Sequence, residues 1–172
     1  MMIKPQDIVI IGKILSKGEE HWSQGQIAAE LKMSASEINA ALKRAERAGL
    51  LRKDTSRYHP VKSAIEEFLL HGFKYVFPAD LGEPTRGIPT GASAPALREY
   101  FLGNDDLPPV WPDPEGEVRG YSLRPLYSSV PAAVKSDPDL YAFLALLDAL
   151  RAGRAREVKL AKSKLQNLLH AS

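Results

Sequence analysis

The clearest pattern of apolar and polar positions lies between residues 22 and 51, where two short amphipathic helices are expected in succession. Ser23 can cap the first helix and Ser34 the second, each with Gln or Glu three residues later in the capping-box position. Gly49 follows the second helix and can adopt the left-handed conformation that ends a helix at no steric cost. Two capped helices joined by a short turn predict a helix-turn-helix, the motif that places its second helix in a major groove.

Further elements are predicted on both sides of this motif. Residues 5–16 suit a helix that begins at a proline, although the β-branched run at 8–11 would also suit a strand. Residues 50–53 and 57–60 flank a polar turn and predict a small β-hairpin, the wing that often follows a recognition helix. Residues 61–73 are expected to form a fourth helix.

The pattern changes between residues 78 and 138, which hold eleven of the thirteen prolines and six of the twelve glycines. Because proline lacks an amide donor and constrains the residue before it, long helices are not expected here. Aromatic residues lie among the prolines, so the segment is expected to pack against the rest of the chain. We predict an ordered but mostly irregular excursion, with one strand around 118–126 and a turn-rich loop at 82–91.

Two helices are predicted at the C-terminal end. Residues 137–151 begin with a capping Asp and have a strongly apolar body, and residues 154–170 form a second helix with a narrow apolar stripe. The stripe consists of Val158, Ala161, Leu165 and Leu168. A stripe this narrow faces a single partner helix, either in the same chain or in a second copy.

Together these elements predict a mainly α-helical fold in three parts. Residues 1–75 are expected to form a winged helix-turn-helix domain, and residues 76–136 the Pro/Gly-rich, partly irregular excursion. Residues 137–172 are expected to form a helical pair that serves packing or dimerisation.

Composition narrows the class of protein. The chain has 172 residues, of which 44% are hydrophobic and 26% charged, as is ordinary for a globular protein. The absence of cysteine excludes disulfides and thiolate metal sites and suits a reducing cytoplasm. No stretch approaches the roughly 20 apolar residues of a membrane span, and no secretory signal is evident. We therefore expect a cytoplasmic protein without a membrane partner.

The net charge is only +2, but cations gather in two regions. The first covers the second helix of the motif and the predicted wing. The second consists of Arg151, Arg154, Arg156, Lys159, Lys162 and Lys164. Either region can contact phosphates, although the second can equally be a solvated helix face.

The second helix of the motif, at about residues 35–48, has one apolar face, which must point into the core. The opposite face carries small polar residues at its N-terminal end and cations further on, as a helix in a major groove requires. We expect Ser36 and Asn39 to contact base edges, since an Asn amide can pair with adenine. The expected DNA-binding residues are Ser34, Ser36, Asn39, Lys43, Arg44 and Arg47 in the helix, and Arg52, Lys53 and Arg57 in the wing. The alternative is an exposed helix with ordinary surface charges, or a winged helix that binds protein.

This region resembles the winged helix-turn-helix of the MarR family of bacterial transcriptional regulators, over about residues 5–75. Residues 26–31, 34–38 and 42–51 carry the resemblance. The middle segment resembles a group of uncharacterised MarR-like bacterial proteins, which implies a toxin–antitoxin or defence setting. The chain departs from the family in its short wing and in lacking a long continuous helix pair after Phe73, so a MarR-type ligand pocket is not expected.

Catalytic chemistry is not expected. The histidines are scattered without metal-ligand spacing, and the glycine-rich stretch at 82–91 lacks the Gly-Lys-Ser/Thr ending of a phosphate-binding loop. The histidines are His21, His59, His71 and His170. No catalytic residue, cofactor or metal is predicted.

The sequence thus predicts a sequence-specific repressor of transcription that binds double-stranded DNA. A homodimer is expected, because one recognition helix rarely supplies enough affinity and two-fold operators are the common solution. The alternative is an antitoxin or adaptor whose C-terminal extension binds a protein partner, such as a nucleotidyltransferase-type toxin.

Overall fold

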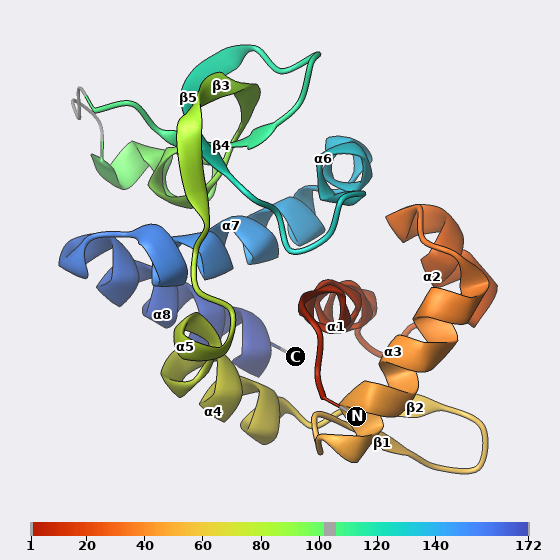
Figure 1. Ribbon diagram of the computed structural model, residues 1–172. Coiled ribbons are helices and arrows are strands. Elements are labelled where there is room, and N and C mark those ends of the chain that lie inside the picture. The colour runs from red at the N-terminus through yellow and green to blue at the C-terminus, as the bar shows by residue number, and fades with distance from the viewer. Residues whose placement is uncertain (1, 102–105, 172) are drawn as a thin grey trace.

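The structure is a computed structural model that describes residues 2–101 and 106–171, and it is mainly helical (Figure 1). The first half contains α1 (Pro5–Lys17), α2 (Gln24–Leu31), α3 (Ala35–Arg47), β1 (Leu51–Lys53), β2 (Tyr58–Pro60), α4 (Lys62–His71) and α5 (Phe73–Val76). The second half contains β3 (Leu81–Pro89), η1 (Gly91–Ser93), η2 (Arg98–Phe101), β4 (Pro109–Pro112), β5 (Val118–Leu123), α6 (Val130–Ala133), η3 (Val134–Ser136), α7 (Pro138–Ala152) and α8 (Ala155–His170).

Helix α1 lies at the centre of the molecule, viewed nearly end-on in Figure 1, with α2 and α3 on one side and α7 on the other. Its β-branched run forms a helix, and the residues from Asp7 to Ile14 are buried all round it. Gly12 permits α7 to approach closely, because a Cβ at this position would lie 2.4 Å from the Phe143 ring. The helix predicted at 5–16 is confirmed, and α1 is the common core of both halves.

Helices α2 and α3 begin where their caps predict. The Ser23 hydroxyl accepts a hydrogen bond from the Gln26 amide at 3.0 Å, and the Ser34 hydroxyl accepts one from the Glu37 amide at 3.1 Å. Gly49 has a φ of +82°, the left-handed conformation expected after α3. Strands β1 and β2 then form a two-stranded antiparallel hairpin.

Strands β3, β4 and β5 form a small closed sheet in which each strand pairs with the other two. Strand β3 runs antiparallel to both neighbours, and β4 and β5 are parallel. The prediction of a turn-rich loop at 82–91, in an excursion with a single strand, was therefore wrong. The prolines do not prevent pairing, because Pro84 lies beside a register shift and Pro89 ends the strand.

Glycines make this closure possible. A Cβ on Gly87 would lie 2.1 Å from the carbonyl oxygen of Trp111, and a Cβ on Gly120 would lie 2.1 Å from that of Pro108. Such contacts are shorter than real Cβ atoms make. The backbones of the three strands can meet this closely only because these positions have no side chain.

The closed sheet is fixed to α7 through a buried carboxylate. Asp148 accepts hydrogen bonds from Thr90 Oγ1 at 2.7 Å and from Trp111 Nε1 at 2.8 Å. It also accepts from Nε and Nη2 of Arg151, which donates in turn to the carbonyl oxygen of Phe77. Burial raises the pKa of Asp148, while the Arg151 guanidinium opposes that rise. The donors surrounding this carboxylate therefore hold the excursion, α5 and α7 together.

The C-terminal helices pack against each other within the chain, but the prediction that α8 faces a single partner helix was wrong. Helix α8 packs against α7 and α4, with Ala161, Leu165 and Leu169 buried. Leu168 is half exposed, so its predicted place in the buried stripe was wrong by one residue. The four-residue steps from Ala161 to Leu165 and Leu169 keep one face of the helix on the core.

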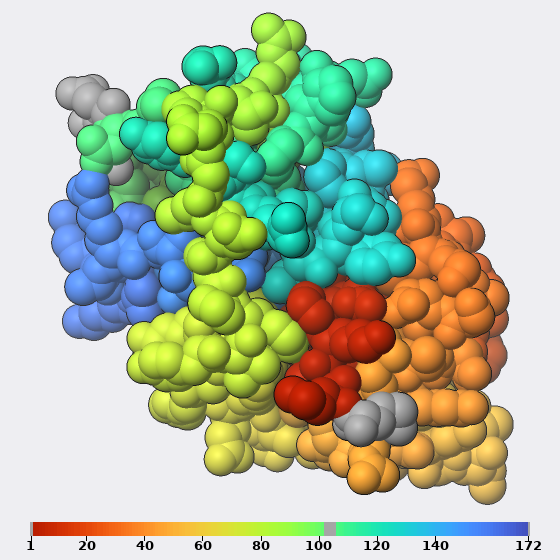
Figure 2. Space-filling model, viewed as in Figure 1, coloured from red at the N-terminus to blue at the C-terminus, as the bar shows by residue number. Residues whose placement is uncertain are grey.

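The two halves share one hydrophobic core. Figure 2 shows the N-terminal residues, the excursion and the C-terminal helices in continuous contact on this face of the molecule. A polar contact also crosses between the halves: Lys13 Nζ of α1 donates to Asp137 Oδ2, 2.5 Å away, at the start of α7. The Ser129 hydroxyl similarly donates to the carbonyl oxygen of Leu31 at the end of α2.

Candidate nucleic-acid interface

Helix α3 has one buried face and one open face. Ile38, Ala41, Leu42 and Ala45 are buried against the core, as the sequence predicts. The opposite positions are exposed, namely Ser34, Ser36, Asn39, Lys43 and Arg47. The Ser34 and Ser36 hydroxyl oxygens lie 3.2 Å apart at the N-terminal end. The sequence therefore located the exposed face of α3 correctly, apart from one residue at its edge.

That residue is Arg44, whose predicted contact with DNA phosphate is contradicted by the structure. Arg44 Nε and Nη2 donate to the two carboxylate oxygens of Asp7 at 2.8 and 2.7 Å, and its side chain is only 8% exposed. The hydrogen bonds from Arg44 to Asp7 raise the pKa of Arg44. Asp7 lies fully buried on α1, so its charge requires a partner inside the protein. An acidic residue among the isoleucines of α1 was the sequence signal for this pairing.

Glu37 extends this ion pair toward the N-terminal end of α3. Its Oε1 accepts from Gln6 Nε2 at 2.9 Å and from Arg44 Nη2 at 3.2 Å. The hydrogen bond from Gln6 lowers the pKa of Glu37, and Arg44 lowers it further. Both ends of this network lie on α1, so it fixes the orientation of α3 on the central helix.

The β1–β2 hairpin follows the C-terminal end of α3 and adds further cations. Arg52 and Lys53 are exposed, and Arg57 is half-buried. The Lys53 ammonium lies 5.1 Å from the centre of the Tyr58 ring. We call the set of Ser34, Ser36, Asn39, Lys43, Arg47, Arg52, Lys53 and Arg57 the α3–hairpin surface.

The hairpin also contains a hydrogen-bonded pair of side chains that sequence reasoning missed. His59 Nε2 lies 2.7 Å from Asp54 Oδ2, across the hairpin turn. The hydrogen bond with His59 lowers the pKa of Asp54.

The second basic region is not brought to this surface. Arg151 is buried against Asp148, Arg154 pairs with Asp106, and the Lys164 ammonium lies 4.9 Å from the Tyr100 ring centre. Arg156 and Lys159 are exposed on α8, which lies across α1 from α3 in Figure 1. The structure therefore separates the two basic regions, and only the first forms part of the α3–hairpin surface.

Within residues 2–101 and 106–171, no group of three or more His, Asp or Glu side chains is placed to hold a metal ion. None of the helices in that part of the chain is both long and apolar enough to cross a membrane. Comparisons with models of known protein families, with curated proteins and with solved structures found no match to this chain.

Proposed function

We propose that the protein is a sequence-specific DNA-binding regulator of transcription, acting as a repressor through a winged helix-turn-helix. The observation that carries the proposal is the open face of α3. It presents Ser36 and Asn39 near its N-terminal end and Lys43 and Arg47 further along, while the other face is buried. Hydroxyl and amide groups suit base edges, and cations suit phosphates, in this order along a recognition helix.

The dimensions support this arrangement. From Ser36 to Arg47 the helix rises about 16 Å at 1.5 Å per residue, and the major groove of B-DNA is about 12 Å wide. When the N-terminal part of α3 lies in the groove, Lys43 and Arg47 approach the phosphates at its edge. Arg52 and Lys53 of the hairpin then face the neighbouring backbone, in the role of a wing.

The internal contacts of α3 serve this function by fixing the helix before it meets DNA. Arg44 does not bind phosphate in this proposal. Its bidentate bond to Asp7 holds α3 on α1 and limits the reorientation that binding would otherwise require. We further propose that two copies bind a two-fold operator, because one recognition helix supplies limited affinity.

The test is fluorescence anisotropy of the protein on the DNA upstream of its own gene and on a scrambled duplex, across a salt series. We expect tighter binding to the upstream DNA, with a preference that persists as salt rises. Lys43→Glu combined with Arg47→Glu should weaken binding and flatten the salt dependence. The matched control is Arg156→Glu with Lys159→Glu, which reverses two exposed cations on α8.

Equal loss of affinity in both double variants would contradict a role for α3 and indicate a nonspecific response to charge. Equal affinity for the two duplexes would contradict sequence specificity. Absence of binding to either duplex would reject DNA binding.

A second candidate is an antitoxin or adaptor whose extension binds a protein partner such as a nucleotidyltransferase-type toxin. It is favoured by Tyr75 and Val76 of α5, two neighbouring exposed apolar residues at the boundary where the extension begins. Aromatic residues are common anchors of protein interfaces. In this case Tyr75→Glu would abolish the biological effect, and charge reversal at Lys43 and Arg47 would not.

A further inference from the structure

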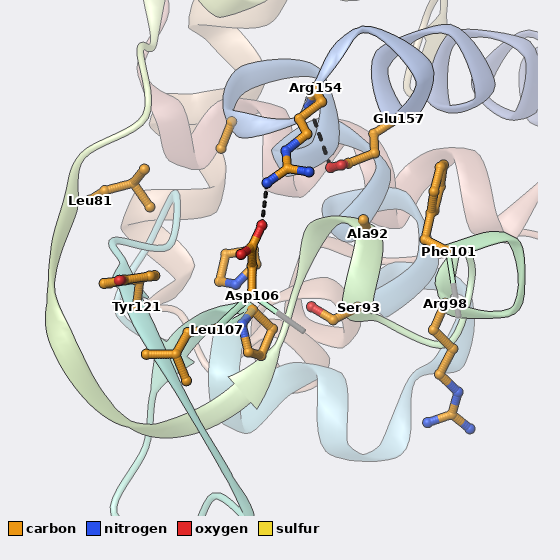
Figure 3. Close-up of a pocket in the computed structure, with 13 residues that line it drawn as sticks. Leu81, Ala92, Ser93, Arg98, Phe101, Asp106, Leu107, Tyr121, Arg154 and Glu157 are labelled. Carbon is orange, nitrogen blue, oxygen red and sulfur yellow. Dashed lines mark hydrogen bonds and ion pairs between the residues drawn. The ribbon is translucent and has the colours of Figure 1, made fainter. Parts of the chain in front are cut away.

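A cavity of about 420 Å³ is lined by residues from the second half of the chain, between Leu81 and Glu157 (Figure 3). It is open to solvent and is lined by the closed sheet on one side, by η1 and η2 on the other, and by the junction between α7 and α8. Its size falls within the range of about 300–1,000 Å³ that is usual for small-molecule sites. The resemblance to the MarR winged helix-turn-helix covers only about residues 5–75, and the cavity lies outside that range.

The walls of the cavity are mostly apolar. In Figure 3, Tyr121 and Leu81 lie on one side of the space and Phe101 on the other. Three of the lining residues are large apolar side chains left exposed: Leu81 at 54%, Tyr121 at 46% and Leu107 at 42%. Exposed apolar side chains gathered around one concave space are typical of a surface that is covered when a ligand binds.

Among the described lining residues the charged groups are few, and their formal charges sum to zero. Arg154 forms an ion pair with Asp106, and the Arg154 amide donates to Glu157 Oε1 at 3.4 Å. Arg98 is the remaining charged group among the described lining residues, and in Figure 3 its guanidinium points away from Asp106 and Glu157. The two arginines and the two carboxylates therefore balance in formal charge without all being paired. The Ser93 hydroxyl is the small neutral polar group of the lining, and it donates to the carbonyl oxygen of Thr90.

We propose that this cavity binds a small uncharged molecule with a flat apolar body and one hydrogen-bonding group. The flat body lies between Phe101 and Tyr121, and the polar group meets the Ser93 hydroxyl or the Arg154–Asp106 pair. A charged ligand would lose its hydration on entering the cavity, and the described lining residues have no net charge to compensate that loss. This site does not depend on the proposed DNA binding, because it shares no residue with the α3–hairpin surface.

The first test is a fluorescence titration with N-phenylnaphthylamine, an uncharged two-part aromatic molecule with one N–H donor. Anilinonaphthalene sulfonate has the same skeleton with an added negative charge and is the matched comparison. We expect one saturable site per chain, with affinity for the uncharged dye at least about tenfold higher than for the sulfonate, because the described lining residues carry no net positive charge. Tighter binding of the sulfonate would overturn the assignment of an uncharged ligand.

Substitutions at the rim locate the bound dye. Leu81→Glu and Tyr121→Glu place a carboxylate at the edge of the cavity and should each weaken dye binding at least about tenfold. Leu168→Glu and Tyr75→Glu are the matched controls, since they alter exposed apolar residues outside the cavity lining. Circular dichroism monitors folding, and Leu107→Ser is a milder rim variant if a glutamate variant unfolds.

Three results would overturn the proposal. These are equal loss of dye binding in the rim and control variants, binding that does not saturate, and no binding. A dimer that dissociates on Leu81→Glu, without a change in dye affinity, would show that a second copy covers the cavity. Sedimentation velocity on the same variants separates that outcome from ligand binding.

Discussion

At the scale of single residues, Lys43 and Arg44 are neighbours on α3 with opposite environments. Lys43 points to solvent, whereas Arg44 turns to the core and meets Asp7. A rotation of 100° between successive helical residues is enough to separate them. Whether an edge position faces water or protein is decided by the residue that packs opposite, and here that residue is a buried carboxylate.

Arg44→Ala should destabilise the protein by about 3–5 kcal/mol, because it leaves the Asp7 charge buried without its partner. Urea denaturation measures the change, and Lys43→Ala, one residue away, should change the free energy of unfolding by less than about 0.5 kcal/mol. The double variant Asp7→Leu with Arg44→Leu should recover most of the loss, since it removes both charges. A double variant less stable than Arg44→Ala would contradict this account.

The lowered pKa of Glu37 predicts that the stability of the protein depends on pH. The pKa of Glu37 is lower in the folded protein than its ordinary value of 4.5, so the ionised carboxylate stabilises the folded state at pH values above 4.5. That stabilisation is lost as the pH falls through the lower pKa of the folded state. Glu37→Gln should therefore destabilise the protein most near neutral pH, and the difference from wild type should shrink below about pH 4.5. Stability curves from urea melts at several pH values check this. Glu46→Gln removes an exposed carboxylate from the same helix and controls for net charge, so identical difference curves for the two variants would count against the Glu37 network.

At the scale of elements, the helices are determined by residues close together in the sequence, whereas the closed sheet is determined by contacts between distant segments. The helices carry their own caps and periodicity, whereas each of β3, β4 and β5 is short or interrupted by proline and depends on its partners for hydrogen bonds. The sheet closes because glycines lie where backbones meet. These glycines have the most flexible backbone when taken alone, but in the folded protein the neighbouring strands leave no room for a side chain at their positions.

Gly87→Ala and Gly82→Ala form a matched pair on β3. A Cβ at Gly87 would meet the Trp111 carbonyl oxygen at 2.1 Å, whereas the nearest atom to a Cβ at Gly82 lies 3.7 Å away, an ordinary contact. We expect Gly87→Ala to destabilise by about 1–3 kcal/mol or more through overpacking, and Gly82→Ala by less than about 0.5 kcal/mol. Thermal melts of the two variants measure the difference, and similar midpoints would mean that the strands can separate at no cost.

At the scale of the whole molecule, the N-terminal motif and the extension fold against a common helix. Helix α1 buries side chains toward both, and the Lys13–Asp137 and Ser129–Leu31 contacts join them across the core. A chain with one continuous core of this size is expected to unfold in a single transition.

The two tryptophans test this, because Trp22 lies beside α2 and Trp111 lies in β4. In a Trp22→Phe variant, fluorescence reports on the closed sheet alone, whereas far-ultraviolet circular dichroism reports mainly on the helices. The two denaturation curves should coincide. Fluorescence that changes at a lower urea concentration than the circular dichroism would instead show that the extension unfolds independently.

The sequence by itself determined helices α1 to α4, α7 and α8, the caps of α2 and α3, the hairpin and the exposed face of α3, but not the short helices α5 and α6. Each of these depends on residues within a few positions of one another, through helical periodicity and capping hydrogen bonds. The same local signals favoured a loop at 82–91 and predicted one strand in place of three, because proline and glycine are turn formers when read alone.

Only the tertiary structure decided the closed sheet, the inward turn of Arg44, the burial of Leu169 in place of Leu168, and the cavity beside Tyr121. Strand pairing joins segments far apart in the chain, and no short window of sequence contains both partners. Arg44 meets a carboxylate 37 residues away, and Asp148 binds donors 58 and 37 residues away. The free energy of these contacts depends on distance in space and on burial, so they are fixed only when the whole chain has folded.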